Sequence, residues 1–273
     1  MAPAEARQPR AWLIPAADLA PSIRREASMT TRTALITGVS RPLGLGFAVA
    51  RQLAERDHHV VLTARDADQA EQLAAQLRQD NLQVTALRLD LTDRASMDET
   101  IAHLARSFGH LDVLINNASI FPDTGVLSVL DADLDAVRAA LEVDVIGPWG
   151  LIQAALPLLR KAPAARIVNV SSVAALQITA GVDLAASLRS PAYSIAKYLL
   201  TVLTTKIADE LRDTGILVNA VDPGEIASHP ERGDEDNARS AADSARGVVW
   251  AATLDEDGPT GGFFRDGHLL KLT

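Results

Sequence analysis

The sequence predicts a single α/β domain built on a doubly wound parallel sheet with helices on both faces. Short apolar runs of strand length alternate with longer segments of helical period, and a glycine-rich loop joins the first run to the first helix. Strands that alternate with helices form a parallel sheet, and ligands of such sheets bind beyond the carboxyl ends of the strands. The chemically distinctive residues of this chain follow such ends, which predicts a single site there.

Each predicted strand is a short apolar run, and each predicted helix has apolar residues three or four positions apart. The expected strands are 33–37, 59–63, 83–89, 111–116, 165–171 and 216–221. The expected helices are 47–56, 66–79, 93–108, 131–160 (one long helix or a bent pair), 191–212 and a last one around 240–254. His58 and His59 come just before a strand and are expected at the surface.

Composition limits the class of protein. A chain of 273 residues with 48% hydrophobic residues can bury one substantial core. Its net charge of −9 argues against a nucleic-acid or anionic-membrane partner, and no apolar run reaches the ~18 residues of a membrane span. With no cysteine and no histidine pair at metal-ligand spacing beside a carboxylate, no metal site is expected. We expect a cytoplasmic enzyme-sized domain.

Residues 1–28 differ from the rest of the chain. They are rich in Ala, Pro and Arg and have no sustained period. A disordered N-terminal extension, or a start placed too far upstream, is favoured over a weak amphipathic targeting sequence. The expected folded domain is therefore 29–273.

The glycine-rich loop runs from Gly38 to Gly46 between the first strand and the first helix. Gly38 permits a sharp exit from the strand, and Gly44 and Gly46 allow a close approach of cofactor or helix. Strand, glycine loop and helix together form the context of a phosphate site in a Rossmann-type fold. The expected contacts of the loop with a dinucleotide are Gly38, Ser40, Arg41, Gly44, Leu45 and Gly46.

The end of the second strand bears on the choice of cofactor. An acidic residue there accepts the ribose hydroxyls of NAD, whereas a basic residue accommodates the extra phosphate of NADP. Here Arg65 follows the strand, no carboxylate stands at its tip, and Arg41 lies in the glycine loop. Two guanidiniums that converge on a phosphate favour NADP(H).

Tyr193 and Lys197 are four residues apart at the start of the helix expected over 191–212. On a helix they project from one face, where an ammonium stabilises the phenolate form of tyrosine and so suits it to proton transfer. By itself this spacing more often means an aromatic ring packed under a lysine. The pair gains meaning from the motifs around it.

Taken together, the motifs resemble the short-chain dehydrogenase/reductase superfamily over essentially all of 29–273. The order and spacing of the whole set are specific, although no single motif is. The matching motifs are Thr37-Gly38…Gly44-Leu45-Gly46, Asp90, Asn116-Asn117-Ala118, Ser171-Ser172, Tyr193-x-x-x-Lys197 and Asp222-Pro223-Gly224. The ending 258–267 and the long stretch between Ser172 and Tyr193 are similar to the carbonyl-reductase-like branch.

The resemblance implies roles for these residues. Tyr193 would donate the proton to a carbonyl oxygen, Lys197 would support the phenolate and bind the nicotinamide ribose, and Ser172 would position the substrate oxygen. Asp90 would face the adenine and Asn117 the adjacent ribose. Further cofactor contacts would come from Leu91, Ala118, Pro223, Gly224 and Ile226.

Four departures from the family pattern bear on function, the mildest being Ser228 in place of a usual threonine in the segment after Pro223-Gly224. Five residues rather than three separate Gly38 from Gly44, and the apolar period after Gly46 favours a two-residue insertion over replacement of a glycine by Pro42. Asp144 stands where the family has an asparagine that completes a water-linked relay to the lysine, and its charge could pair with Lys197. A serine, Ser119, stands where the Asn-Asn-Ala motif normally ends in glycine.

The leading hypothesis is NADPH-dependent, reversible reduction of a ketone or aldehyde to an alcohol. A second hypothesis on the same fold is a reductase of a biosynthetic intermediate such as a 3-oxoacyl thioester or polycyclic ketone. A third, of another class, is a non-catalytic NADP-binding regulatory protein. The residues indicate neither the individual substrate nor a choice between monomer and homo-oligomer.

Overall fold

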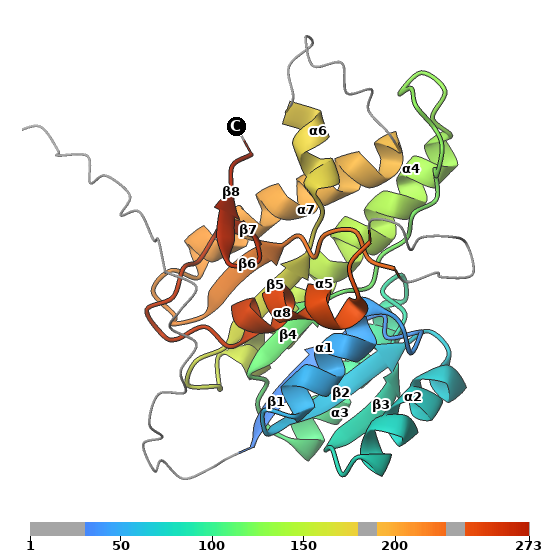
Figure 1. The fold of residues 1–273 in the computed structure, drawn as a ribbon. Helices are drawn as coiled ribbons and strands as arrows, with labels where there is room; N and C mark the ends of the chain where they lie inside the picture. The colour runs from blue at the N-terminus through green and yellow to red at the C-terminus, as the bar shows by residue number, and fades with distance from the viewer. Residues whose placement is uncertain (1–30, 180–189, 228–237, 273) are drawn as a thin grey trace, which may run out of the picture. The chain divides into compact units, whose positions relative to one another are not determined.

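A computed structural model of the chain describes residues 31–179, 190–227 and 238–272, which belong to one compact unit (Figure 1). Residues 1–28 lie outside the described part. Within the described residues the sheet has eight strands in the order β3-β2-β1-β4-β5-β6-β7-β8, and only the β7–β8 pair among them is antiparallel. The strands are β1 (Arg32–Ile36), β2 (His58–Ala64), β3 (Val84–Arg88), β4 (Val113–Asn116), β5 (Arg166–Val170), β6 (Leu217–Val221), β7 (Phe263–Arg265) and β8 (His268–Leu270).

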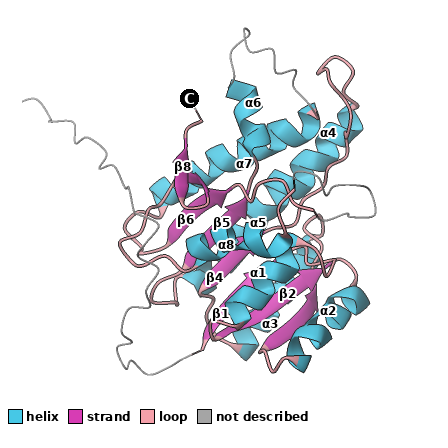
Figure 2. Ribbon diagram, in the orientation of Figure 1, coloured by secondary structure: helices cyan, strands magenta, loops and turns pink. Residues whose placement is uncertain are grey.

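Helices cover both faces of this sheet (Figure 2). α1 (Leu45–Ala54), α2 (Ala67–Gln79) and α8 (Ala241–Ala252) share one apolar core, and α3 (Arg94–Ser107) and α5 (Gly147–Leu159) contribute to the other. The remaining segments are α4 (Leu134–Leu141), a π-helical segment η1 (Glu142–Ile146), a 3₁₀ turn η2 (Val173–Ala175), α6 (Leu176–Thr179) and α7 (Pro191–Glu210). The doubly wound α/β fold expected from the sequence is therefore confirmed.

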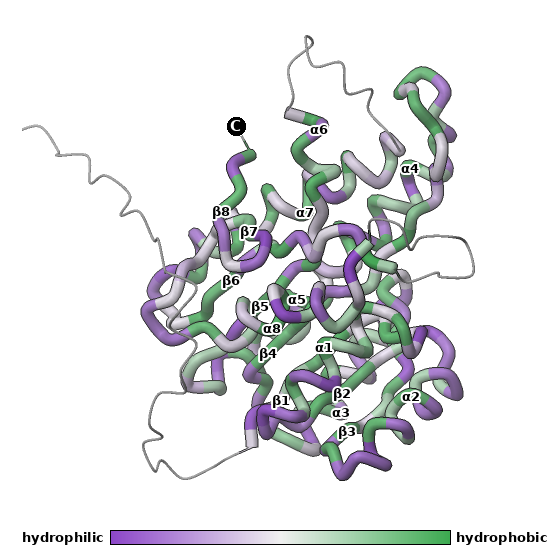
Figure 3. The backbone as a smooth tube through the Cα atoms, viewed as in Figure 1, coloured by the Kyte–Doolittle hydropathy of each residue, from purple (hydrophilic) through white to green (hydrophobic). Residues whose placement is uncertain are grey.

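The strands are apolar along most of their length because both faces of the sheet are buried. β4, β5 and β6 are buried at every residue, and the central strands are largely hydrophobic in Figure 3. Continuous apolar runs of this kind gave the predicted strands, and the observed bounds agree to within about two residues. The sheet thus holds the ends of six parallel strands at one edge.

Two expectations about secondary structure and burial were wrong. Strands β7 and β8 were not predicted, because each contributes only three residues to the sheet. His58 is the first residue of β2 and only 4% exposed, not a surface residue before the strand. Its Nδ1 lies 3.0 Å from the carbonyl oxygen of Arg56.

One stretch of the described residues, Leu134–Leu159, is long and apolar enough to cross a membrane by length and composition alone. It is the bent pair expected over 131–160, interrupted by η1, and 44% of its apolar 18-residue window is buried inside the protein. A core helix passes the same test. Here α5 packs in the apolar core beneath the sheet, and α4 packs against α7.

Candidate active site

Six residues of the predicted motifs follow the carboxyl ends of six parallel strands. They are Gly38 after β1, Arg65 after β2, Asp90 after β3, Asn117 after β4, Ser172 after β5 and Asp222 after β6. β1 and β4 are neighbours in the sheet although two strands separate them in sequence. The strand order reverses at that point, where doubly wound sheets bind their ligands.

The glycine loop makes the close approaches that its glycines permit. Gly38 has a φ of +71°, and a Cβ added to it would lie 2.5 Å from the Cα of Ala118 in the loop after β4. A Cβ on Gly46 would lie 2.7 Å from Nδ2 of Asn117. Gly44 is the N-cap residue of α1, which begins at Leu45.

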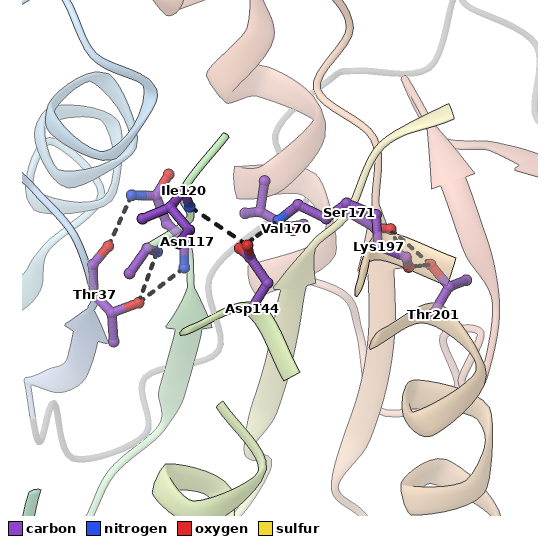
Figure 4. A network of polar contacts seen from close by, with 9 residues as sticks. Thr37, Asn117, Ile120, Asp144, Val170, Ser171, Lys197 and Thr201 are labelled. Carbon is purple, nitrogen blue, oxygen red and sulfur yellow. Dashed lines mark hydrogen bonds and ion pairs between the residues drawn. The ribbon is translucent and has the colours of Figure 1, made fainter. Parts of the chain in front are cut away.

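Asn117 ties the loop after β4 to the end of β1 (Figure 4). Its Nδ2 donates hydrogen bonds to the carbonyl oxygens of Thr37 (2.7 Å) and Gly38 (3.2 Å). In return, Oγ1 of Thr37 accepts from the backbone N–H groups of Asn117 and Ala118, each at 3.0 Å. The side-chain nitrogen of Asn117 therefore links the loop after β4 to the end of β1.

Asp90 and Arg65 lie near each other at the ends of β3 and β2. Oδ1 of Asp90 accepts from the N–H (3.0 Å) and hydroxyl (2.8 Å) of Thr92. The Thr92 backbone hydrogen bond lowers the pKa of Asp90 most; partial burial opposes this, and the charges of Arg65 and Arg88 add to the lowering. Arg65 is exposed, as is Arg41 in the glycine loop. Val39, two residues before Arg41, donates a 2.7 Å bond to the carbonyl of Thr63 near the end of β2.

Tyr193 and Lys197 project from one face of α7, as their spacing predicted. Nζ of Lys197 lies 5.5 Å from the centroid of the Tyr193 ring. The ring of Tyr193 is half-buried and meets the ring of Phe121, with centroids 4.6 Å apart and planes inclined at 54°. Phe121 is 53% exposed, so an apolar surface lies beside the phenol.

Lys197 is buried, and its ammonium group has two hydrogen-bond acceptors within the protein. Its Nζ donates to Oδ1 of Asp144 at 3.2 Å and to the carbonyl of Val170 at 3.0 Å (Figure 4). Burial alone would lower the pKa of Lys197, but the charge of Asp144 and, next, the phenol of Tyr193 outweigh it, so this pKa is raised. Lys197 is therefore an ammonium in the folded protein.

Asp144 is completely buried and belongs to the π-helical segment η1 between α4 and α5. Its second oxygen, Oδ2, accepts from the N–H of Ile120 at 3.4 Å, so the carboxylate joins α7 to the loop after β4. The residue that departs from the family thus forms a direct ion pair with Lys197. Single π turns inside α-helices occur frequently at functional sites.

Ser172 begins the 3₁₀ turn after β5. Its Oγ accepts from the N–H of Ala174 at 3.1 Å. The same turn is held by Asp222, whose Oδ1 accepts from the N–H of Val173 at 3.1 Å and whose Oδ2 pairs with Arg265 of β7. Sequence reasoning noted Asp222 only as part of a motif and missed that it anchors this turn.

The other predicted cofactor contacts lie along the same edge. Leu91 is buried against Gly147, where an added Cβ would be 2.7 Å from the leucine Cβ. Pro223 is buried and Gly224 has a φ of +78°. Ile226 forms an isolated β-bridge with Arg239, and the stretch 228–237 between them lies outside the described residues. Among the residues that the structure covers, no group of three or more His, Cys, Asp or Glu side chains could hold a metal ion.

Comparisons with known proteins agree with this arrangement. A family model described as short chain dehydrogenase matches residues 32–238. The oxidoreductase UcpA of Salmonella typhimurium is 32% identical over 198 residues, which are 72% of this chain and 70% of that protein.

Two solved structures share the fold. A protein from Pseudomonas syringae described as a short chain dehydrogenase is 27% identical with a TM-score of 0.73, over 86% of this chain and 94% of the other. Salutaridine reductase from Papaver somniferum superposes with a TM-score of 0.71 over 86% of this chain and 99% of that one, at 23% identity, which shows the fold alone.

The family model covers well over half of the chain, from β1 to beyond β6. Within that span the motif residues lie at one edge of the sheet, around the point where the strand order reverses. The chain therefore belongs to the short-chain dehydrogenase/reductase family of oxidoreductases, which use NAD(P) as cofactor.

Proposed function

We propose that this protein reduces a ketone or aldehyde to an alcohol with NADPH, reversibly, and that Tyr193 is the proton donor. The observation that supports this most strongly is the buried Lys197 ammonium beside the Tyr193 ring, held by Asp144 and Val170. A charged lysine that is out of water and cannot swing away acts strongly on a neighbouring phenol.

The residues at the edge of the sheet fit a dinucleotide. The absence of side chains at Gly38 and Gly46 leaves the loop close to Ala118 and Asn117, and α1 presents its N-terminus beyond Gly44, where a pyrophosphate is favoured. Ser40, Leu45, Asp90, Leu91, Pro223, Gly224 and Ile226 complete the set we propose for the cofactor. When bound, the nicotinamide supplies the hydride.

The chain's own residues would supply the proton and the orientation. Ser172 would donate from its hydroxyl to the substrate oxygen, because its Oγ accepts from Ala174 and so directs its own hydrogen elsewhere. Tyr193 would pass its phenolic proton to the same oxygen as negative charge develops there. Lys197 would stabilise the phenolate that remains.

We infer NADPH rather than NADH from Arg65 and Arg41. Arg65 follows β2, where a carboxylate would face the ribose hydroxyls of NAD, and it lies close enough to Asp90 to lower the pKa of that carboxyl. A guanidinium in this place suits the additional phosphate of NADP. We further propose a carbonyl-reductase-like substrate range and a cytoplasmic location.

The test uses purified protein, NADPH and a panel of ketones and aldehydes, with the nicotinamide absorbance as the readout. Tyr193→Phe should lose at least about three orders of magnitude in kcat, because the proton donor is removed. Tyr198→Phe is the matched control, since the chain has only these two tyrosines and Tyr198, five residues further along α7, projects about 140° around the helix from Tyr193. If Tyr193→Phe retains most of the wild-type turnover, the proposal is excluded. If the wild type binds NADPH but turns over no substrate of the panel, a non-catalytic protein is favoured.

A further inference from the structure

Helix α7, which carries Tyr193 and Lys197, begins without a cap of its own. Its N-cap residue, Ser190, has a left-handed conformation (φ 54°, ψ 66°), and its side chain makes no capping hydrogen bond. Pro191 has no N–H, so Ala192 provides a backbone donor of the first turn just before Tyr193. The start of the helix therefore depends on groups from elsewhere in the fold.

Those groups come from the loop after β4. Oδ2 of Asp123 accepts from the N–H of Ala192 at 2.6 Å, and the carbonyl of Val126 accepts from the N–H of Ser190 at 2.7 Å. Asp123 is 69 residues away in sequence and only 4% exposed. Its other oxygen, Oδ1, accepts no hydrogen bond from the described residues. Burying a carboxylate costs free energy, and Asp123 is buried in spite of that cost.

Three other helices carry local aspartate caps. Asp66, Asp93 and Asp133 each accept from N–H groups two or three residues further along their own chain segment, and they cap α2, α3 and α4. Such local caps stabilise a single helix. The Asp123 cap joins two separate segments, and each of them carries an aromatic ring of the site: Phe121 lies two residues before Asp123, and Tyr193 follows Ala192.

We propose that Asp123 is a positioning residue for the reaction: by binding Ala192 it fixes the Tyr193 phenol and the Phe121 ring relative to each other. The 4.6 Å separation of the two ring centroids is the consequence of this cap. The inference that Asp123 affects turnover rests on the proposed function. A phenol displaced by a fraction of an ångström transfers its proton poorly, while the cofactor contacts around α1 and the β2 end do not depend on Asp123.

The kinetic test compares three variants. Asp123→Ala should lower kcat about tenfold or more and leave the KM for NADPH unchanged. Asp123→Asn should stay within about threefold of the wild type, because its amide oxygen accepts the same N–H. The matched control is Asp133→Ala, which removes an aspartate cap from α4 that accepts from Asp135 at 2.9 Å and should leave kcat unchanged. Wild-type kcat in Asp123→Ala, or equal losses in the Ala and Asn variants, would overturn the proposal.

A second readout needs no activity. In a Tyr198→Phe background, 3-fluorotyrosine labels Tyr193 alone, because the chain has two tyrosines. The ¹⁹F resonance should shift or broaden in Asp123→Ala and stay unchanged in Asp123→Asn and Asp133→Ala. If Asp123→Ala does not fold, Asp123→Leu removes the acceptor while filling its space. An unchanged resonance would overturn the positioning role, whereas activity in Tyr193→Phe would refute only the proposed function.

Discussion

Replacing Asp144 by asparagine removes one charge of the buried pair with Lys197 and restores the residue usual in the family. At 3.2 Å, two unit charges attract by about 5 kcal/mol at an effective dielectric constant of ~20. The asparagine oxygen keeps a hydrogen bond to the ammonium, and burying an amide costs less than burying a carboxylate. These gains offset more than half of the loss. We expect Asp144→Asn to lower the free energy of unfolding by about 2 kcal/mol, and Tm by roughly 4–8 °C.

The pH dependence of this difference follows from the sign of the Lys197 shift. The pKa of Lys197 is raised in the folded protein, so its charged form stabilises the fold below the ordinary lysine pKa and loses that effect as the pH rises above it. The Tm difference between wild type and Asp144→Asn should therefore be full at neutral pH and shrink in the alkaline range. Differential scanning fluorimetry from pH 7 to 11 measures it. Glu142→Gln removes a carboxylate from the same π segment and is the control for net charge.

The second test of Asp144→Asn measures its activity. Asp144→Asn should stay within about tenfold of the wild-type rate, because an acceptor still faces Lys197. Its pH–rate profile for alcohol oxidation should move to lower pH, because the Tyr193 phenolate no longer has a carboxylate near its supporting ammonium. If the pH–rate profile and Tm are identical to those of the wild type, the ion pair between Asp144 and Lys197 affects neither stability nor catalysis. A profile displaced to higher pH would show that Lys197 loses its proton without Asp144.

Three further predictions concern other parts of the chain. NADPH should bind about tenfold or more tightly than NADH, and Arg65→Ala should weaken only NADPH, as measured by fluorescence titration; equal affinities in the wild type would contradict the assignment. Burial is the largest cause of the lowered pKa of His58. The neutral, buried His58 therefore stabilises the fold above the ordinary histidine pKa, and this stabilisation is lost as the pH falls below that pKa. His58→Phe should therefore flatten Tm between pH 7 and 5, and an unchanged slope would refute this. Deleting residues 1–28 should leave Tm and turnover unchanged, and a large fall in Tm would show that they dock on the domain.

The sheet could be predicted from sequence because its strands are buried on both faces. Such strands read as unbroken apolar runs, and the runs around Leu35, Leu62 and Val218 placed β1, β2 and β6. β7 and β8 gave no comparable signal, since three residues such as Phe263–Arg265 cannot establish a period. His58 was misplaced for a related reason: a polar side chain at the first position of a strand can be buried by the helices that cover it.

The motif residues were predictable because chemistry requires particular side chains at particular strand ends. The groups that hold them in place were not. Asp123 is a single acidic residue in a loop, and nothing local distinguishes it from a solvated aspartate such as Asp131. Asp222 belongs to a predicted motif, but the motif does not show that its carboxylate anchors the turn after β5. The partner of Asp123 is 69 residues away in sequence, and the partners of Asp222 are 49 and 43 residues away. Only folding of the chain brings these groups into contact.

The π-helical segment η1 combines a feature that the sequence predicted with one that only the structure shows. The apolar period over 131–160 predicted a helix or a bent pair, but it could not show that Glu142–Ile146 adopts a wider turn. A regular α-helix advances about 100° per residue, and the extra residue of a π turn rotates the side chains that follow it relative to those before it. In this chain that turn carries Asp144, whose carboxylate is completely buried against Lys197 and bonded to Ile120. A buried charge on a distorted helical turn persists only where its partners compensate it, so the substitution at 144 and the raised pKa of Lys197 are two aspects of one electrostatic arrangement.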